Sequence, residues 1–258
     1  MDRDWEQKMN RLFQEDRDGL LGADPEWAEL MANFSMGEVP RENKLTERER
    51  LLCILSALLG CQGLGAYRNL LKTALDAGLE PIAVKEMLYQ ATAYLGFGRV
   101  YDFLKATNQI MRQREIGLPL TPQATVSAET RFEKGLAKQV ALFGEGMAKR
   151  QTEGPALRRN INRWLADNCF GDYYTRQGLN DQEREIITFC FLLAQGGCEN
   201  QLRGHTAGNF GVGNGVEKLY SVVEQCMPYI GYPRSLNAMG IIDDTAKNIQ
   251  KAQGKDHE

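Results

Sequence analysis

The chain repeats itself once, and this repetition constrains the fold more than any other feature of the sequence. Four features of the first half recur in the same order in the second half, offset by 134 to 137 residues. The recurring segments are Trp27 with Asn33-Phe34 and Trp164 with Asn168-Cys169-Phe170, Leu45–Arg50 and Leu179–Arg184, Gly60-Cys61 and Gly197-Cys198, and Tyr94–Arg99 and Tyr229–Arg234. Chance does not preserve such an order, so we interpret the chain as two homologous halves. Proline and small polar residues interrupt the pattern near residues 117–127. We therefore place an N-terminal repeat at 1–117 and a C-terminal repeat at 118–258.

Both halves carry the pattern of α-helices. Thr46 and Glu49 are spaced as in a capping box, and so are Asn180 and Glu183. The helices that these boxes open, predicted at 47–59 and 181–195, are apolar nearly all round, which is typical of buried helices. Further helices are predicted at residues 64–77, 82–94, 100–114, 132–149, 156–168, 201–210 and 216–227. The short alternating runs of strands are missing from the sequence. The predicted fold class is all-α, with two tandem helical repeats.

Charge and hydropathy exclude several classes of partner. The 31 Lys and Arg residues face 34 Asp and Glu, a net charge of −3, so no basic excess exists to neutralise a nucleic-acid backbone. The longest apolar runs, at residues 51–59 and 189–194, are far shorter than a membrane span. Residues 1–6 are acidic and lack the apolar core of a signal peptide. We expect a cytoplasmic protein that acts on a small molecule, without nucleic-acid or membrane partners.

The cysteines and histidines narrow the chemistry. None of the six cysteines belongs to a C-x-x-C pair, so a bound metal is not expected. Two pairs lie eight residues apart; on one helix this separates their Cα atoms by about 12 Å, beyond the roughly 7 Å that a disulfide spans. All except Cys198 are expected in the core. His257 lies in a polar tail, which leaves His205 as the histidine of the folded body.

His205 shares a predicted helix face with other residues that carry polar groups. Cys198, Gln201, Leu202 and His205 fall at positions i, i+3, i+4 and i+7. A core-facing stripe that carries a thiol, an amide and an imidazole needs partners or a pocket. The alternative interpretation is a solvent-facing helix with an incidental histidine.

Glu185 is the second candidate, because the two repeats differ there. The capping box accounts for Glu183 but not for Glu185, whose counterpart in the first repeat is Leu51. The counterpart of His205 is Leu70 or Arg68, depending on the register. The second repeat thus has an acid and a histidine that the first repeat lacks, and the first is interpreted as a structural repeat that lost its chemistry. Glu185 alternatively is a first-turn acid favoured by the helix dipole.

The second half resembles the carboxymuconolactone decarboxylase family, part of the superfamily that includes the alkyl hydroperoxidase D proteins. The segments that carry the resemblance are Phe170–Leu179, Arg184–Thr188, Gly196–His205 and Tyr229–Ala238. It covers roughly residues 160–240 and, more weakly, roughly 27–115. The resemblance implies an all-helical fold and a homo-oligomer, with a trimer of pseudo-sixfold symmetry favoured for a tandem form.

Two chemistries occur in this superfamily. The peroxidase branch uses Cys-x-x-Cys-x-x-x-His with an upstream glutamate. Here Cys198 takes the place of the first cysteine, Gln201 replaces the second, His205 keeps the histidine, and Glu185 sits one residue from the glutamate position. Without a second thiol a local dithiol cycle cannot run. The peroxidase alternative is a one-cysteine cycle in which an external thiol resolves a Cys198 sulfenate.

The decarboxylase branch requires neither a thiol pair nor a cofactor, and we favour it. Loss of CO₂ from a carboxylactone leaves a dienolate, so the enzyme must bind carboxylates, stabilise an oxyanion and return a proton. We expect His205 to be the acid and Glu185 to orient it. The predicted substrate-binding residues are Arg184, Gln201, Tyr229 and Arg234, with Arg203 a further candidate for holding a carboxylate. A third hypothesis is a non-catalytic oligomer that kept the fold.

Overall fold

The computed structural model describes residues 3–14 and 17–255, and this part of the chain contains helices and no β-strand. The predicted all-α class is thereby confirmed. The N-terminal repeat contains α1 (Arg3–Phe13), α2 (Arg17–Ala23), α3 (Pro25–Asn33), the π-helical segment η2 (Phe34–Glu38), α4 (Val39–Glu42), α5 (Glu47–Gly60), α6 (Leu64–Asp76), α7 (Pro81–Leu95) and α8 (Phe97–Gln113). The C-terminal repeat contains α9 (Arg131–Phe143), α10 (Gly146–Thr152), the short 3-10 helix η3 (Ala156–Arg158), α11 (Arg159–Trp164), the π-helical segment η4 (Leu165–Tyr174), α12 (Asp181–Gln195), α13 (Glu199–Gly211), α14 (Val216–Ile230) and α15 (Tyr232–Lys255).

The last four helices of the two repeats correspond in order, offset by 134 residues at α5 and α12 and by 135 at the three helices that follow. Both predicted capping boxes form: Thr46 and Asn180 each accept a hydrogen bond from the backbone of the glutamate three residues on. From there α6 and α13, α7 and α14, and α8 and α15 begin 135 residues apart. In this register His205 lies opposite Leu70, which decides between the two counterparts considered above. Cys198 is the N-cap of α13 and lies opposite Gly63, the N-cap of α6, so the Gly60-Cys61 and Gly197-Cys198 similarity is not a structural equivalence.

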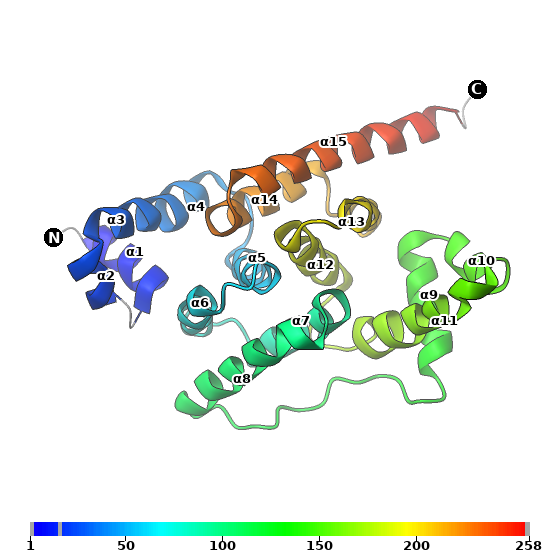
Figure 1. Ribbon diagram of the computed structural model, residues 1–258, viewed down its shortest axis with the longest axis horizontal. Helices are drawn as coiled ribbons and strands as arrows, with labels where there is room; N and C mark the ends of the chain where they lie inside the picture. Colours follow the sequence, from blue (N-terminus) through cyan, green and yellow to red (C-terminus); the bar gives the residue numbers. More distant parts are fainter. Residues whose placement is uncertain (1–2, 15–16, 256–258) are drawn as a thin grey trace.

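Helices α5 and α12 pack against each other at the centre of the molecule (Figure 1). Both are buried along almost their whole length, as predicted. Each central helix also packs against a helix of the other repeat, α7 against α12 and α14 against α5. The apolar cores interlock accordingly: the first includes Ile187 and Phe191 of α12, and the second includes Cys53 and Ala57 of α5. Because α7 packs against α12 and α14 packs against α5, each repeat contributes side chains to the surroundings of the other repeat's central helix.

The ends of the molecule are formed by helices outside this shared arrangement. Helices α1 to α3 lie at one end and α9 to α11 at the other (Figure 1). Residues 114–130 form an extended segment that runs from α8 past α7 to α9 (Figure 1). The predicted boundary between 117 and 118 falls within it.

Some predicted helices differ in detail. The helix predicted at 132–149 breaks at Gly144, whose φ of +84° favours glycine, and divides into α9 and α10. The segment predicted at 156–168 divides into η3, α11 and the start of η4. Helices α1 to α3 and α15 were not predicted. No helix in residues 3–14 and 17–255 combines the length and apolar character needed to cross a membrane. His257 lies outside the described residues.

Candidate active site

The centre of the site is a buried contact between a carboxylate and an imidazole. Glu185, on the second turn of α12, is fully buried. Its Oε2 lies 2.9 Å from Nδ1 of His205 on α13. The His205 side chain is 12% exposed, so one edge of its ring stays accessible. The structure thus brings together the two residues in which the second repeat differs from the first.

Local packing on α12 and α13 fixes this contact. The capping box at Asn180 sets the start of α12 and therefore the direction of Glu185. A Cβ atom at Gly208 would lie 2.6 Å from Glu185 Oε2, so glycine is required for α13 to approach this closely. The Asn209 amide donates to the backbone carbonyls of both Glu185 (3.0 Å) and His205 (2.8 Å). The carboxylate and the imidazole are therefore held by their backbones as well as by each other.

A chain of hydrogen-bond donors ends on the Glu185 carboxylate. The Tyr174 hydroxyl donates to Glu185 Oε1 at 3.0 Å and lies 2.8 Å from Thr188 Oγ1. Tyr94 donates to the Tyr174 oxygen at 2.9 Å, and the Gln90 amide donates to Thr188 Oγ1 at 2.8 Å. An ionised carboxylate only accepts hydrogen bonds. Oε1 accepts one from Tyr174, and Oε2 can accept one from His205 when the imidazole carries its proton on Nδ1.

Aromatic side chains surround the imidazole. The rings of Tyr94 and Phe143 each meet the His205 ring edge-to-face, with centroids 5.3 Å apart. Burial, and secondarily the charge of Glu185, raises the pKa of Tyr174 well above its usual range. Burial also raises the pKa of Tyr94, with Cys169, Tyr174 and Glu185 adding to it. Both phenols consequently stay neutral donors at physiological pH. An imidazole in such surroundings interacts strongly with any charge that develops beside it.

The second ring nitrogen of His205 is the group left for chemistry. Nδ1 is committed to Glu185, whereas Nε2 has no hydrogen-bond partner within the described part of the chain. Because the Nδ1 contact orients the ring, it also fixes where Nε2 points. The arrangement can hold a proton on Nε2 or receive one there, with Glu185 stabilising the imidazolium form.

Sequence reasoning missed the contribution of the first repeat. Tyr94 and Gln90 come from α7 and complete the network around Glu185. The signal was present in the recurrence of Tyr94 as Tyr229, but the prediction assigned the role to Tyr229. The structure does not bring Tyr229 to the Glu185–His205 pair, because α14 carries it to the first repeat's side, near Ser35 and Arg50. Its hydroxyl is buried there beside Ser35, without a hydrogen bond of normal geometry among the described residues.

The first repeat lacks the carboxylate and the imidazole at the equivalent positions. Leu51 and Leu70 occupy the positions of Glu185 and His205, and both are buried in the core. Gln225, the counterpart of Gln90, lies in α14 with neither amide atom hydrogen-bonded within residues 3–14 and 17–255. The first repeat therefore keeps the outer donors of the network without its charged centre.

Arg184 is a structural residue. It is 1% exposed, and its guanidinium donates to Gln90 Oε1 (2.7 Å) and to the carbonyls of Arg176 (2.7 Å) and Gln177 (3.2 Å). Glu86 Oε2 lies 3.5 Å away, and burial lowers the pKa of Arg184. The donors of Arg184 are used in these buried contacts, so the structure does not place the residue where a substrate carboxylate could reach it, as had been expected.

Cys198 and Arg234 lie apart from the pair, at the N-terminal end of α13. Cys198 precedes the helix with φ −139°, so it does not continue the face that carries His205, which corrects the expected stripe. Its thiol donates to the Leu192 carbonyl at 3.3 Å, and burial raises its pKa. With Arg234 it lines a small cavity of about 30 Å³. A thiol with a raised pKa is a poor nucleophile.

Gln201 and Arg203 are both exposed on α13. Gln201 lies one turn before His205, on the same side of the helix. Arg203 faces Asp244 of α15 instead, at 3.8 Å. By helix spacing, Gln201 shares a side of α13 with His205 and Arg203 does not.

Comparison with known proteins defines the class. The model of the carboxymuconolactone decarboxylase family matches residues 25–109 and again residues 160–244. The chain therefore belongs to the carboxymuconolactone decarboxylase family, in a tandem two-repeat form, as the sequence resemblance indicated.

Individual relatives agree with this assignment. A 4-carboxymuconolactone decarboxylase of Acinetobacter baylyi is 27% identical over 128 residues, which cover 49% of this chain and 95% of that protein. A crystal structure of a candidate gamma-carboxymuconolactone decarboxylase subunit from Burkholderia xenovorans superposes with a TM-score of 0.54 over 95% of this chain and 97% of that one, at 16% identity. At that identity the structural likeness concerns the fold.

Proposed function

We propose that this protein is a decarboxylase that removes CO₂ from a small carboxylated lactone, with His205 and Glu185 returning the proton. The observation that carries the proposal is the buried contact of 2.9 Å between Glu185 Oε2 and His205 Nδ1, with the other carboxylate oxygen accepting a hydrogen bond from Tyr174. The name of the Acinetobacter relative supplies the substrate class.

The reaction needs one proton at one carbon. When the bond to the carboxylate breaks, its electron pair is delocalised towards the lactone carbonyl as a dienolate. The Nε2–H of the His205 imidazolium then protonates carbon, which leaves a neutral imidazole with its proton on Nδ1, and Nε2 regains a proton from solvent. Glu185 lowers the free energy of the imidazolium form that precedes transfer, because opposite charges interact strongly in a buried site. Tyr94 and Tyr174 hold that carboxylate in place.

In this proposal, exposed residues bind the substrate carboxylates. Gln201, one helical turn from His205, is close enough to contact a substrate bound at Nε2. Arg234 is also exposed, beyond the N-terminal end of α13. Both remain candidate substrate-binding residues.

The peroxidase alternative has less support. It requires Cys198 as an attacking thiolate, but burial raises the pKa of this thiol, and its Sγ donates to a backbone carbonyl. Gln201, in the place of a resolving cysteine, has no redox chemistry.

We also propose the oligomer expected above, a trimer with pseudo-sixfold symmetry. Large exposed apolar side chains come in equivalent pairs: Phe97 and Tyr232 begin α8 and α15, and Tyr101 and Leu236 lie one turn further on. The same surface thus occurs twice in one chain. Such a surface suits a ring in which alternate repeats make equivalent contacts.

The test measures two activities on the same preparations. Wild type, Cys198→Ser and His205→Gln are given 4-carboxymuconolactone, with CO₂ release followed, and separately cumene hydroperoxide with dithiothreitol. We expect wild type and Cys198→Ser to release CO₂ at equal rates and His205→Gln to be slower by about 10² to 10⁴, the usual contribution of a positioned acid. Hydroperoxide consumption that depends on Cys198 supports the peroxidase instead. Absence of both activities in wild type favours the non-catalytic oligomer.

A further inference from the structure

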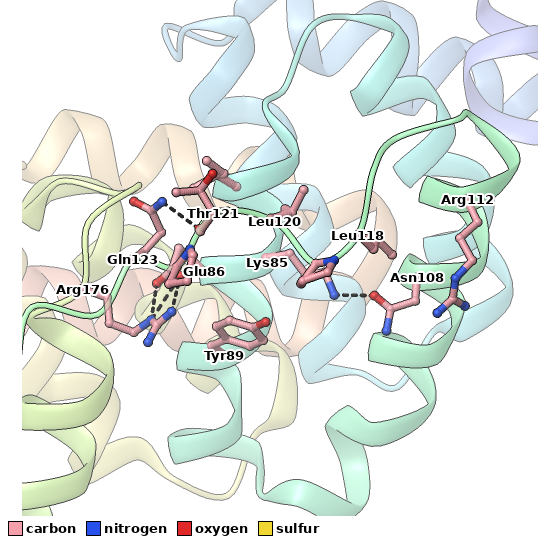
Figure 2. Close-up of a pocket in the computed structure, with 13 residues that line it drawn as sticks. Lys85, Glu86, Tyr89, Asn108, Arg112, Leu118, Leu120, Thr121, Gln123 and Arg176 are labelled. Atoms are coloured by element: carbon pink, nitrogen blue, oxygen red, sulfur yellow. Dashed lines mark hydrogen bonds and ion pairs between the residues drawn. The ribbon is translucent and has the colours of Figure 1, made fainter. Parts of the chain in front are cut away.

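A second concave site lies under the segment that joins the repeats. A pocket of about 360 Å³ opens between α7, α8 and residues 118–123, and Arg176 closes one end (Figure 2). It contains neither Glu185 nor His205. Its volume lies at the lower end of the range typical of small-molecule sites.

The charges in this pocket are unbalanced. Three cations and one carboxylate line it. The carboxylate, Glu86, is fully engaged: Arg176 Nε contacts both of its oxygens at 2.9 and 3.1 Å, and Arg176 Nη2 donates at 3.0 Å. Arg184 approaches Glu86 from behind at 3.5 Å. The remaining cations are Lys85 and Arg112. Neither forms an ion pair with a carboxylate of the described residues.

Lys85 is held without a counter-ion. Its residue is 8% exposed, and its ammonium donates to the neutral amide oxygen of Asn108. Figure 2 shows Lys85 and Arg112 on the same side of the pocket, with Asn108 between them. Burial and the charge of Arg112 both lower the pKa of Lys85. A buried cation beside a second cation is costly unless an anion joins them.

The rest of the wall is largely apolar. Ile82, Leu118 and Leu120 line it, and the ring of Tyr89 is held in place by the Arg176 guanidinium, 5.2 Å from its centroid. A fully hydrated inorganic anion would leave this surface unused. The combination of two cations and an apolar wall fits an organic acid.

The second repeat gives an internal comparison. In the shared register the Lys85–Asn108 contact is replaced by Tyr220, whose hydroxyl donates to Asp243 Oδ1 at 2.7 Å. A carboxylate thus stands where the first repeat has an amide, and a phenol where it has an ammonium. The unbalanced positive charge belongs to the first repeat, which lost the Glu–His pair, and is not a general consequence of the fold.

We infer that this pocket is a binding site for a small organic carboxylate. The carboxylate lies between Lys85 and Arg112, with Asn108 in contact, and the apolar body lies against Tyr89 and the joining segment. The site is separate from the proposed catalytic centre and does not depend on the proposed reaction.

Isothermal titration with benzoate tests this inference. The proteins compared are wild type, Lys85→Met and Arg112→Met, with two controls: Lys247→Met, the second-repeat counterpart of Arg112, and His205→Gln. We expect one benzoate per chain for wild type and both controls, and an affinity at least tenfold lower for Lys85→Met and Arg112→Met. Arg112→Lys should keep most of the affinity, and benzamide, which lacks the charge, should not bind.

Several results would overturn the inference. These are no saturable binding to wild type in the millimolar range, equal binding by Lys85→Met and Arg112→Met, or loss of binding in His205→Gln, which would place benzoate in the other site. Equal affinity for inorganic phosphate would refute the role of the apolar wall. Circular dichroism and melting temperature establish that each variant is folded, so that a loss of affinity reports on the site.

Discussion

The repeats supply a matched pair of tyrosines whose hydroxyl groups should contribute differently to stability. Tyr94 and Tyr229 occupy equivalent positions in α7 and α14, and in each case phenylalanine keeps the ring and removes only the hydroxyl. The Tyr94 hydroxyl donates to Tyr174 at 2.9 Å and lies 3.7 Å from the Cys169 sulfur. The Tyr229 hydroxyl is buried beside Ser35 and makes no hydrogen bond of normal geometry with a described residue.

The expected magnitudes follow from these contacts. Tyr94→Phe removes one good hydrogen bond and one weak one, which should lower the free energy of unfolding by about 1 kcal/mol. Tyr229→Phe removes an unsatisfied polar group whose burial costs about 1–3 kcal/mol, so it should leave stability unchanged or raise it by about 1 kcal/mol. The two variants should therefore differ by about 1–2 kcal/mol although their chemistry is the same.

Urea unfolding, followed by circular dichroism at one protein concentration, measures the difference. An unchanged dependence on urea would show that both variants unfold from the same compact state. Only Tyr94→Phe should also slow CO₂ release. If Tyr229→Phe lost as much stability as Tyr94→Phe, the unsatisfied hydroxyl, and with it the interpretation of the first repeat as a site without acceptors, would be refuted.

Four further predictions concern the Glu185–His205 pair, the thiols and the assembly. Nitrogen-15 spectra should show the His205 proton on Nδ1 in wild type, and Glu185→Gln should weaken that preference; an Nε2–H tautomer in wild type would contradict the contact. Because burial raises the pKa of Cys198, and that of Cys169 to about 12, alkylation by iodoacetamide should be slow at pH 7 and accelerate only above pH 9, whereas rapid reaction of Cys198 at pH 7 would contradict the structure. For the same reason, stability should fall as pH rises above about 9, where unfolded thiols ionise and the buried ones do not. Light scattering should give the mass of a trimer, and Phe97→Ser should shift it towards smaller species; a monomeric wild type would refute the proposed ring.

Most of the fold could be predicted from the sequence because its signals are local. The capping boxes at Thr46 and Asn180 fix where α5 and α12 begin, and their apolar surfaces indicate burial. The break at Gly144 was missed because one glycine within an apolar pattern does not by itself end a helix. The π-helical segment η4, which carries Tyr174, has no distinct residue pattern and is set by packing on α9 and α7.

The site was predictable only where the repeats differ. Glu185 and His205 stand out against Leu51 and Leu70 in a sequence comparison. The packing of α7 against α12 and of α14 against α5 cannot be read from the residues, so the sequence indicated Tyr229 although Tyr94 is the tyrosine that lies beside His205. Residue type alone also could not distinguish a buried arginine, such as Arg184, from one that faces a ligand.

The central claim is that Glu185 and His205 act as one unit in the proposed decarboxylation. The most direct measurement is kcat for CO₂ release from 4-carboxymuconolactone by wild type, Glu185→Gln, His205→Gln and the double variant. Residues that act as a unit give strongly non-additive effects. We predict that His205→Gln is slower by about 10² or more, that Glu185→Gln is also slowed, and that the double variant is no slower than His205→Gln. Wild-type rates in either single variant, or fully additive losses in the double variant, would contradict the account.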